Sequence, residues 1–256
     1  MTSQRAIPRH RHAGALVHRE GRSVIAVCAA VLAVITLLVR KYRGPAAAQR
    51  LTALSLTSLG FLSQFFRHPA CVTPVEVDLV VAPASGRVVH IGLEEELEIL
   101  GDRRLRVSVF LSVFDAHLTR SPITGRVLDQ RYHPGRYLVA LHPKSSTLNE
   151  RNSILLEHPG GSRVLVRQIA GFLARRICSY VAVGESVAVG EELGFIKLGS
   201  RVDLFLPAEV LVLVRPGQTV RAGETSVARL AAAPKDADDS VSIVELQAVH
   251  ETEVES

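Results

Sequence analysis

Two apolar runs near the N-terminus dominate the hydrophobic pattern of the chain. Residues 23–39 (SVIAVCAAVLAVITLLV) carry no charge, and residues 51–66 (LTALSLTSLGFLSQFF) are of similar length but contain several Ser and Thr residues. Arg40, Lys41 and Arg43 close the first run, which argues against a cleavable signal peptide, because small residues follow the apolar stretch of such a peptide. The pattern predicts two helices that form a hairpin, each near the minimum length for spanning a membrane.

Basic residues flank the first apolar run on both sides. Residues 1–22 contain five arginines, and residues 40–50 contain three arginines and one lysine. The slight excess at the N-terminus favours a hairpin whose N-terminus and following domain face the cytoplasm. A shallow hairpin that enters one leaflet and returns fits the short runs equally well. Two helices buried in a soluble core are the remaining alternative.

Between residues 78 and 230 the pattern changes to short β-rich runs separated by Gly and Pro. Apolar and polar residues alternate in residues 104–110 (RLRVSVF) and 163–169 (RVLVRQI), which is typical of half-buried antiparallel strands. Residues 168–180 are a candidate short helix. We therefore expect a mainly β domain with minor α content, folded as a compact barrel or sandwich.

A short internal repeat refines this expectation. Residues 184–190 (GESVAVG) and 217–223 (GQTVRAG) share the pattern G-[EQ]-x-V-x-x-G, and such glycines supply the positive φ that a tight reversal needs. The pattern resembles the barrel-sandwich-hybrid fold of biotinyl and lipoyl domains, although the lysine-bearing turn of those carriers is absent. A non-enzymatic, membrane-anchored adaptor with a lipoyl-like domain is therefore one interpretation of the chain.

Composition and charge exclude several classes of function. Thirty Lys+Arg against 25 Asp+Glu give a net charge of +5, a modest excess that suits an anionic surface such as lipid. Aromatic residues make up 5% with no Trp, so a nucleic-acid binder that stacks bases on aromatic side chains is not expected. Cys28, Cys71 and Cys178 lack CxxC spacing, which excludes a disulfide framework and a cysteine-built zinc site. We expect no metal site.

Three stretches of the sequence carry a family resemblance. They are residues 81–88 (VAPASGRV), 110–125 (FLSVFDAHLTRSPITG) and 194–207 (GFIKLGSRVDLFLP), supported by FFRHP at 65–69 and QIAGFLARRI at 168–177. Together they resemble the phosphatidylserine decarboxylase proenzymes, most closely the short bacterial type, over residues 23–230. The resemblance implies a lyase that cleaves itself at the Gly199–Ser200 bond.

The chemistry of that family would use Ser200 twice. Its hydroxyl would attack the Gly199 carbonyl to give an ester, and elimination followed by hydrolysis would leave a pyruvoyl group on the new chain. This pyruvoyl cofactor, derived from Ser200, would form a Schiff base with phosphatidylserine and withdraw electrons while carbon dioxide leaves, giving phosphatidylethanolamine. The fragments 1–199 and 200–256 would stay packed as a heterodimer, with membrane lipids as partners and a homo-oligomer left open.

The resemblance also assigns His117, in FDAH, to self-cleavage, decarboxylation or both, because imidazole transfers protons near neutral pH. Asp115 either orients His117 or pairs with a nearby arginine. Ser85 stands where the family has an aspartate that supports the histidine, and serine cannot supply its negative charge. The sequence leaves three interpretations open. The chain is an active enzyme, with Asp78, Asp115 or Asp203 as substitute, a homologue whose self-cleavage is weakened or lost, or a variant engineered at Ser85 to trap the proenzyme.

These observations predict four segments. Residues 1–22 form a basic N-terminal segment and residues 23–69 a membrane-anchoring helical hairpin. Residues 70–230 form the catalytic domain, and residues 231–256 form a tail that is rich in acidic residues, lacks aromatics and is expected to be disordered. The expected location is the cell membrane, with the catalytic domain on the cytoplasmic side.

Overall fold

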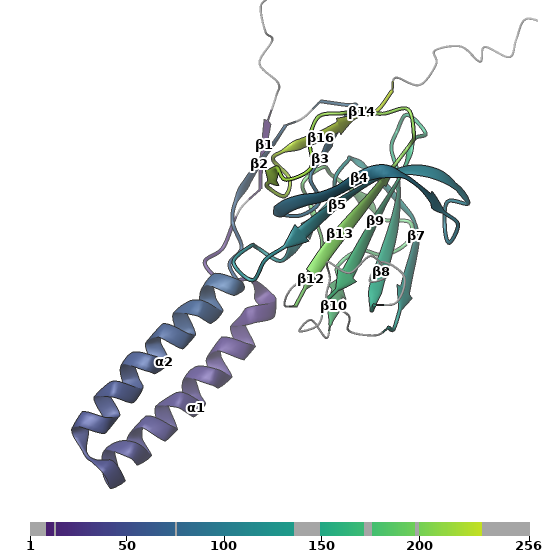
Figure 1. The fold of residues 1–256 in the computed structure, drawn as a ribbon. Coiled ribbons are helices and arrows are strands. Elements are labelled where there is room, and N and C mark those ends of the chain that lie inside the picture. The colour runs from purple at the N-terminus through teal and green to yellow at the C-terminus, as the bar shows by residue number, and fades with distance from the viewer. Residues whose placement is uncertain are drawn as a thin grey trace, which may run out of the picture.

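A computed structural model of the chain describes residues 9–12, 14–74, 76–135, 149–171, 176–197 and 200–231. The expected acidic tail, apart from its first residue, lies outside these ranges. Strands make up most of the regular structure, and two helices form a hairpin that projects from the β domain (Figure 1). The prediction of a mainly β fold preceded by a helical hairpin is confirmed.

The hairpin consists of α1 (Arg19–Arg43) and α2 (Pro45–Phe65). Gly44 joins the helices with a φ of +86°, which glycine adopts without strain, and Pro45 starts α2 where its missing N–H costs no helical hydrogen bond. α1 begins four residues before the uncharged run. The side chain of His18 accepts a hydrogen bond from the Glu20 N–H at 3.3 Å and so caps the helix there.

Most apolar side chains of the hairpin point away from protein. The exposed ones on the two helices are Val24, Val27, Val31, Val34, Ile35, Leu37, Leu38, Leu54, Leu56 and Phe61. Among the described residues, α1 is the one helix long and apolar enough to cross a membrane. Exposure of so large an apolar surface is compatible with membrane association. It argues against two helices buried in a soluble core.

The β domain is built from antiparallel strands. They are β1 (Arg9–His12), β2 (Cys71–Pro74), β3 (Leu79–Val81), β4 (Gly86–Glu96), β5 (Asp102–Leu111), β6 (Leu118–Arg120), β7 (Gly125–His133), β8 (Arg151–Glu157), β9 (Arg163–Ala170), β10 (Ile177–Ser179), β11 (Ser186–Val187), β12 (Glu192–Ile196), β13 (Ser200–Leu206), β14 (Leu211–Val212), β15 (Thr219–Val220) and β16 (Ser226–Arg229). The expected helix over residues 168–180 is wrong at both ends, since β9 runs through Ala170 and β10 covers 177–179; residues 172–175 lie outside the described ranges.

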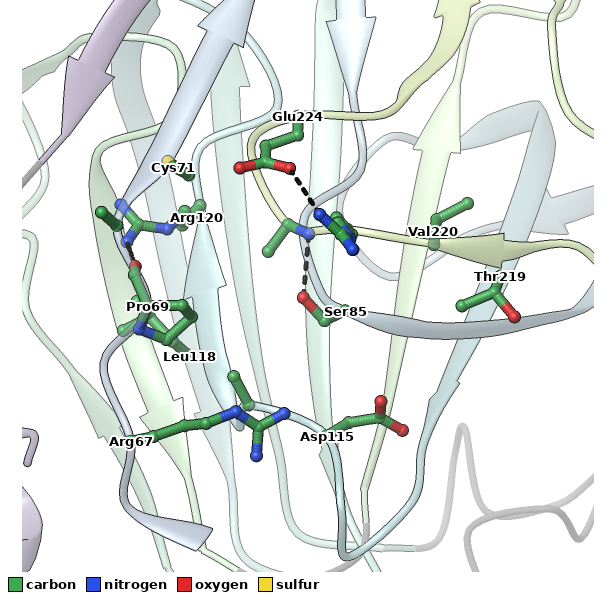
Figure 2. A pocket seen from close by; sticks show the side chains of 14 residues that line it. Arg67, Pro69, Cys71, Ser85, Asp115, Leu118, Arg120, Thr219, Val220 and Glu224 are labelled. Atoms are coloured by element: carbon green, nitrogen blue, oxygen red, sulfur yellow. Dashed lines mark hydrogen bonds and ion pairs between the residues drawn. The ribbon is translucent and has the colours of Figure 1, made fainter. Parts of the chain in front are cut away.

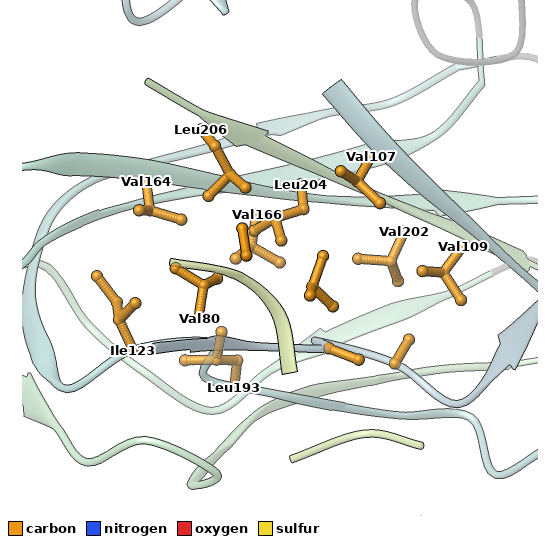
Figure 3. Close-up of a cluster of buried hydrophobic side chains, with 14 of the residues drawn as sticks. Val80, Val107, Val109, Ile123, Val164, Val166, Leu193, Val202, Leu204 and Leu206 are labelled. Carbon is orange, nitrogen blue, oxygen red and sulfur yellow. The ribbon is translucent and has the colours of Figure 1, made fainter. Parts of the chain in front are cut away.

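The strands form one large sheet and three small ones. The large sheet has the order β11-β7-β8-β9-β13-β5-β4-β15, and the smaller sheets are β10-β12-β6, β14-β16-β3 and β1-β2. The main core lies between the large sheet and the two three-stranded sheets. Val107 and Val109 of β5, with Val202 and Leu204 of β13, point into it (Figure 3). β5 and β9, the strands expected from apolar alternation, therefore both contribute apolar side chains to this core.

The two halves of the domain repeat one topology. β6 to β12, taken in chain order, correspond to β3, β4, β5, β13, β14, β15 and β16. The large sheet is symmetric about the β9–β13 pair, and each half contributes one three-stranded sheet. The second half is therefore inserted into the first, between β5 and β13. The chain therefore passes between the halves at two places, which we call crossings: between β5 and β6, at residues 112–117, and between Ile196 of β12 and Ser200 of β13.

Matching hydrogen bonds support this internal symmetry. The N–H of Gly217 donates to the Val88 carbonyl at 2.7 Å, and the N–H of Gly184 donates to the Val127 carbonyl at 2.8 Å. All four glycines of the G-[EQ]-x-V-x-x-G repeat have positive φ, as predicted. A second repeat, PASGRV at 83–88 and PITGRV at 122–127, provides the strands with which these glycine turns pair.

Candidate functional site

Ser200 is the first residue of β13, at one crossing between the halves. It pairs with Leu111 of β5 on one side and with Ala170 of β9 on the other. Because side chains alternate along a strand, its hydroxyl shares the core face with Val202. The residue is fully buried, and its Oγ has no hydrogen-bond partner among the described residues. A buried hydroxyl without a partner is costly, and Ser200 is the one polar side chain on the face of β13 that it shares with Val202, Leu204 and Leu206.

His117 lies at the other crossing, just before β6, and is also fully buried. Its Nδ1 lies 2.9 Å from the backbone carbonyl oxygen of Asp115. A carbonyl only accepts, so neutral His117 carries its proton on Nδ1, and Nε2 keeps a lone pair. The ring of Phe65, the last residue of α2, packs against the imidazole with 4.4 Å between centroids.

The strand pairing brings these two crossings to the same end of the domain. The N–H of Ile196, at the end of β12, donates to the His117 carbonyl at 3.0 Å, and Ser200 follows four residues later. Thr119 of β6 accepts a hydrogen bond from Gln168 of β9 at 3.0 Å, which fixes the small sheet over the large one. Ile177, which pairs with Ile196, donates to Glu150 Oε1 at 3.2 Å, and the Glu150 carbonyl accepts the Ala170 N–H at 2.9 Å. Ala170 and its strand partner Ser200 therefore lie toward Ile196 and His117 from the Thr119–Gln168 contact.

Burial sets the protonation state of His117. Desolvation lowers its pKa to about 4, and the hydrogen bond to the Asp115 carbonyl and the Asp115 charge only partly offset this effect. The positive charge of Arg67 lowers the pKa further. At neutral pH the imidazole is therefore uncharged and is in the form that can accept a proton.

Asp115 supports His117 through its backbone. Its carboxylate accepts hydrogen bonds from the Ser112 N–H at 2.8 Å and from the Ser112 hydroxyl at 2.7 Å, which closes the turn before His117. In the described part of the chain it forms no ion pair with an arginine. Of the two roles that the sequence left open, the geometry favours orientation of His117, by the carbonyl oxygen.

Ser85 accepts a hydrogen bond from the Ala222 N–H at 3.0 Å. Thr124, its equivalent in the other half, accepts one from the Val189 N–H at 3.1 Å. The Ser85 hydroxyl therefore has a structural partner. Asp203 is not positioned to replace a missing carboxylate. It pairs with Arg201 at 2.9 Å, and both lie on the face of β13 opposite Ser200.

A cleft of about 310 Å³ opens beside the turn that carries His117. Its walls include Ser85, Asp115, three arginines (Arg67, Arg120 and Arg221) and Glu224, and Figure 2 shows Arg67 extending toward Asp115. Two residues flanking His117, Ala116 and Leu118, complete this side. In the described ranges, no group of three or more His, Cys, Asp or Glu side chains is placed to hold a metal ion.

Sequence reasoning found Ser200, His117, Ser85 and Asp115 but gave no role to Phe65 or Arg67. Both lie in FFRHP, a stretch noted only for its resemblance. A charged residue directly after an apolar run was the available signal for Arg67. Nothing local predicts the contact between Phe65 and His117, because 52 positions separate them.

Comparisons with known proteins show which family the chain resembles. The family model for phosphatidylserine decarboxylase matches residues 59–228. A phosphatidylserine decarboxylase proenzyme of Amoebophilus asiaticus is 41% identical over 217 residues, covering 84% of this chain and 96% of the relative. The proenzyme of Xanthobacter autotrophicus is 44% identical over 222 residues, covering 84% and 90%. That of Symbiobacterium thermophilum is 43% identical over 215 residues, covering 84% and 96%.

The chain belongs to the phosphatidylserine decarboxylase family. The similarity extends over the hairpin base, the turn with His117 and the strand that begins at Ser200. Family membership removes the reason for the alternative of a non-enzymatic adaptor, which rested on the glycine repeat alone. In this phosphatidylserine decarboxylase homologue the repeat has a structural role, since it forms the edge strands β11 and β15 of the large sheet.

Proposed function

We propose that the chain is the proenzyme of a pyruvoyl-dependent phosphatidylserine decarboxylase that cleaves itself between Gly199 and Ser200. The observation that carries the proposal is the buried, unpartnered Ser200 hydroxyl at the crossing next to His117. The three relatives named above are all phosphatidylserine decarboxylase proenzymes, which supports the same activity.

His117 acts as the base in the cleavage step. Its Nε2 takes the proton of Ser200 Oγ while the oxygen attacks the carbonyl carbon of Gly199. The C–N bond then breaks, and the released nitrogen of residue 200 takes up the proton, which leaves an ester between Gly199 and Ser200. The neutral imidazole favours the proposal, because a protonated His117 could not accept this proton.

The residues around Ser200 suit a pyruvoyl group formed from it. Such a group is a carbonyl electron sink for decarboxylation of an amino acid head group. β13 is held between β5 and β9, so residue 200 keeps its place when the preceding bond is cut. All seven residues of β13 are buried, so the group would form on a strand that is packed on both faces.

The substrate class agrees with the hairpin. A lipid head group can react at the membrane surface without extraction of its acyl chains into water. We propose that the β domain lies on the cytoplasmic side of the cell membrane. β1 pairs with β2, so residues 9–12 lie on the same side as the domain. The arginine excess in the sequence of residues 1–22 supports the cytoplasmic side.

Mass spectrometry of the purified protein tests the proposal. Wild-type protein should give two chains, 1–199 and 200–256, the second blocked by a pyruvoyl group, and should release carbon dioxide from phosphatidylserine. Ser200→Ala should give one intact chain without activity. Ser108→Ala is the matched control. The Ser108 hydroxyl is also buried without a hydrogen-bond partner among the described residues. Ser108 lies opposite Asp203 in the strand register, and its side chain is therefore on the other face of the sheet from Ser200. A Ser200→Ala protein that releases carbon dioxide would overturn the proposal.

A further inference from the structure

Arg67 is the first charged residue after the apolar run of α2. It follows the helix end at Phe65 by two residues and lines the 310 Å³ cleft. Its Nη1 donates to the Gln64 carbonyl at 2.9 Å, which fixes the guanidinium at the helix end. Among the described residues its Nε and Nη2 have no protein partner, so one edge of the guanidinium fork is available to a ligand.

The other two arginines of the cleft are engaged. Arg120 is buried and donates to the carbonyls of Gly190 at 2.7 Å and Pro69 at 3.1 Å. Arg221 is 80% exposed and lies 3.7 Å from Glu224. Among the described residues, Arg67 is therefore the cleft arginine that neither pairs with a carboxylate nor is buried against two carbonyls. The walls of the cleft carry one more positive than negative charge.

Phe114 indicates where the cleft lies relative to the membrane. Its side chain is 65% exposed, and its ring makes an edge contact at 6.3 Å with Phe61 on the exposed face of α2. The next residue, Asp115, lines the cleft. If α2 lies in lipid, this contact holds the turn before His117 at the membrane surface. The mouth of the cleft then opens at the depth of the lipid phosphates, where a charged residue ending an apolar helix also lies.

We infer that this cleft is the head-group site for a membrane phospholipid, with Arg67 binding the phosphodiester through its free guanidinium edge. An arginine fork matches two phosphate oxygens. The inference rests on the proposed function for the identity of the lipid and on Arg67, Phe114 and the cleft for its location. It makes Arg67 a substrate-binding residue that determines specificity for phosphorylated lipids.

A binding experiment tests the site without requiring maturation. The uncleaved Ser200→Ala chain, in uncharged detergent, is titrated calorimetrically with dihexanoyl phosphatidylserine. Adding Arg67→Gln should raise Kd about tenfold or more, and Arg67→Lys should raise it less, because lysine keeps the charge but not the fork. Adding Arg163→Gln should leave Kd unchanged. Arg163 is an exposed arginine at the far end of β9 from Ala170.

Two further ligands identify the chemistry. Dihexanoylglycerol, which lacks the phosphate, should bind equally weakly to the parent and Arg67→Gln chains. Inorganic phosphate at millimolar concentration should not displace the lipid; displacement would mark a site for free anions and overturn the lipid assignment. Equal Kd values for the Arg67→Gln and Arg163→Gln chains would overturn the inference outright. If Arg67→Gln does not fold, a Kd for Arg67→Lys equal to that of the parent chain would overturn it too.

Mature enzyme separates this inference from the proposed function. Arg67→Gln should raise KM on micellar phosphatidylserine about tenfold while kcat changes little, and flotation with vesicles should stay at the wild-type level. A KM change that follows a loss of flotation would mean that Arg67 serves membrane anchoring instead. Wild-type protein that binds the lipid through Arg67 but releases no carbon dioxide would refute the proposed function and leave the site standing.

Discussion

Ser85 and Thr124 occupy equivalent positions in the two halves, and each hydroxyl accepts one backbone N–H from the glycine turn opposite. A serine at position 85 therefore completes the same local structure that threonine completes in the other half. The residue at the position of the family aspartate therefore has a structural role in this chain. The position holds the turn at residues 217–223 against β4, whether or not it also carries charge.

Replacement of either hydroxyl should cost stability and leave cleavage intact. Ser85→Ala and Thr124→Ala each lose one acceptor for a backbone N–H, so each should lower the free energy of unfolding by about 1 kcal/mol. Calorimetric unfolding in detergent measures this loss, and a gel time course measures cleavage. If Ser85→Ala stops cleavage while Thr124→Ala does not, Ser85 acts in the reaction itself.

Ser85→Asp should speed cleavage. A carboxylate there can still accept the Ala222 N–H, and it adds a negative charge to the cleft beside the turn of His117. In the proposed cleavage step, that charge would stabilise the imidazolium that forms when His117 accepts the Ser200 proton. The gel time course compares freshly expressed parent and variant in one buffer. A slower variant would mean that this site has been rebuilt around serine.

The rate of self-cleavage should fall only at unusually acidic pH. Because burial lowers the pKa of His117 to about 4, the base form persists far below pH 6.5, and the rate constant should stay nearly flat from pH 8 to about pH 5. The unfolded state binds the proton more tightly, so the free energy of unfolding should fall by up to about 3 kcal/mol as pH drops from 6.5 toward 4. A rate midpoint near pH 6.5 would contradict this account.

At the scale of elements, the base of the hairpin is part of the site. Gly21 of α1 lies so close to Phe66 that a Cβ there would meet the Phe66 side chain at 2.3 Å, so the two helix ends require glycine at their contact. Glu20 pairs at 3.2 Å with Lys197, two residues before Gly199. The hairpin thereby contacts both crossings between the halves, through Phe65 at His117 and through Glu20 at Lys197.

Phe65→Ala tests whether the hairpin base positions His117. Loss of this buried ring should lower the free energy of unfolding by about 3–5 kcal/mol, and the loosened imidazole should slow cleavage at least tenfold. Phe65→Leu should recover most of both losses. Leu56→Ala, on the exposed face of α2, should change neither. The measurements are calorimetric unfolding and the gel time course; wild-type cleavage in Phe65→Ala would show that the contact is only packing.

At the scale of the whole molecule, local pattern predicted the elements, but not their order in space. The alternation in residues 104–110 and 163–169 correctly predicted β5 and β9, and the apolar runs correctly predicted the two helices. The pairing of β13 between β5 and β9 joins segments about 30 to 100 positions apart, and no local period encodes it. Ser200 and His117 came from family resemblance, since neither a Gly-Ser pair nor a lone histidine is distinctive. Phe65 and Arg67 required the fold.

The inserted topology also decides what cleavage does to the molecule. The cut falls at a crossing between halves, and the strands on each side remain in different sheets, β12 with β6 and β10, and β13 with β5 and β9. β15 and β16 of the smaller fragment pair with β4 and β3 of the larger one. The smaller fragment thus supplies a central strand and two further pairings, and its β13 buries every side chain. Its removal would expose much of the core.

The fragments 1–199 and 200–256 should therefore co-elute in mild detergent and separate only when the domain unfolds in guanidinium chloride. Size-exclusion chromatography followed by denaturing gels measures this, with uncleaved Ser200→Ala as the control. The unfolding midpoint of the cleaved protein should rise with protein concentration, because its unfolding releases two chains. That of Ser200→Ala should not. Recovery of the smaller fragment alone in mild detergent would show that the cut dismantles the sheet, contrary to the pairing of β13.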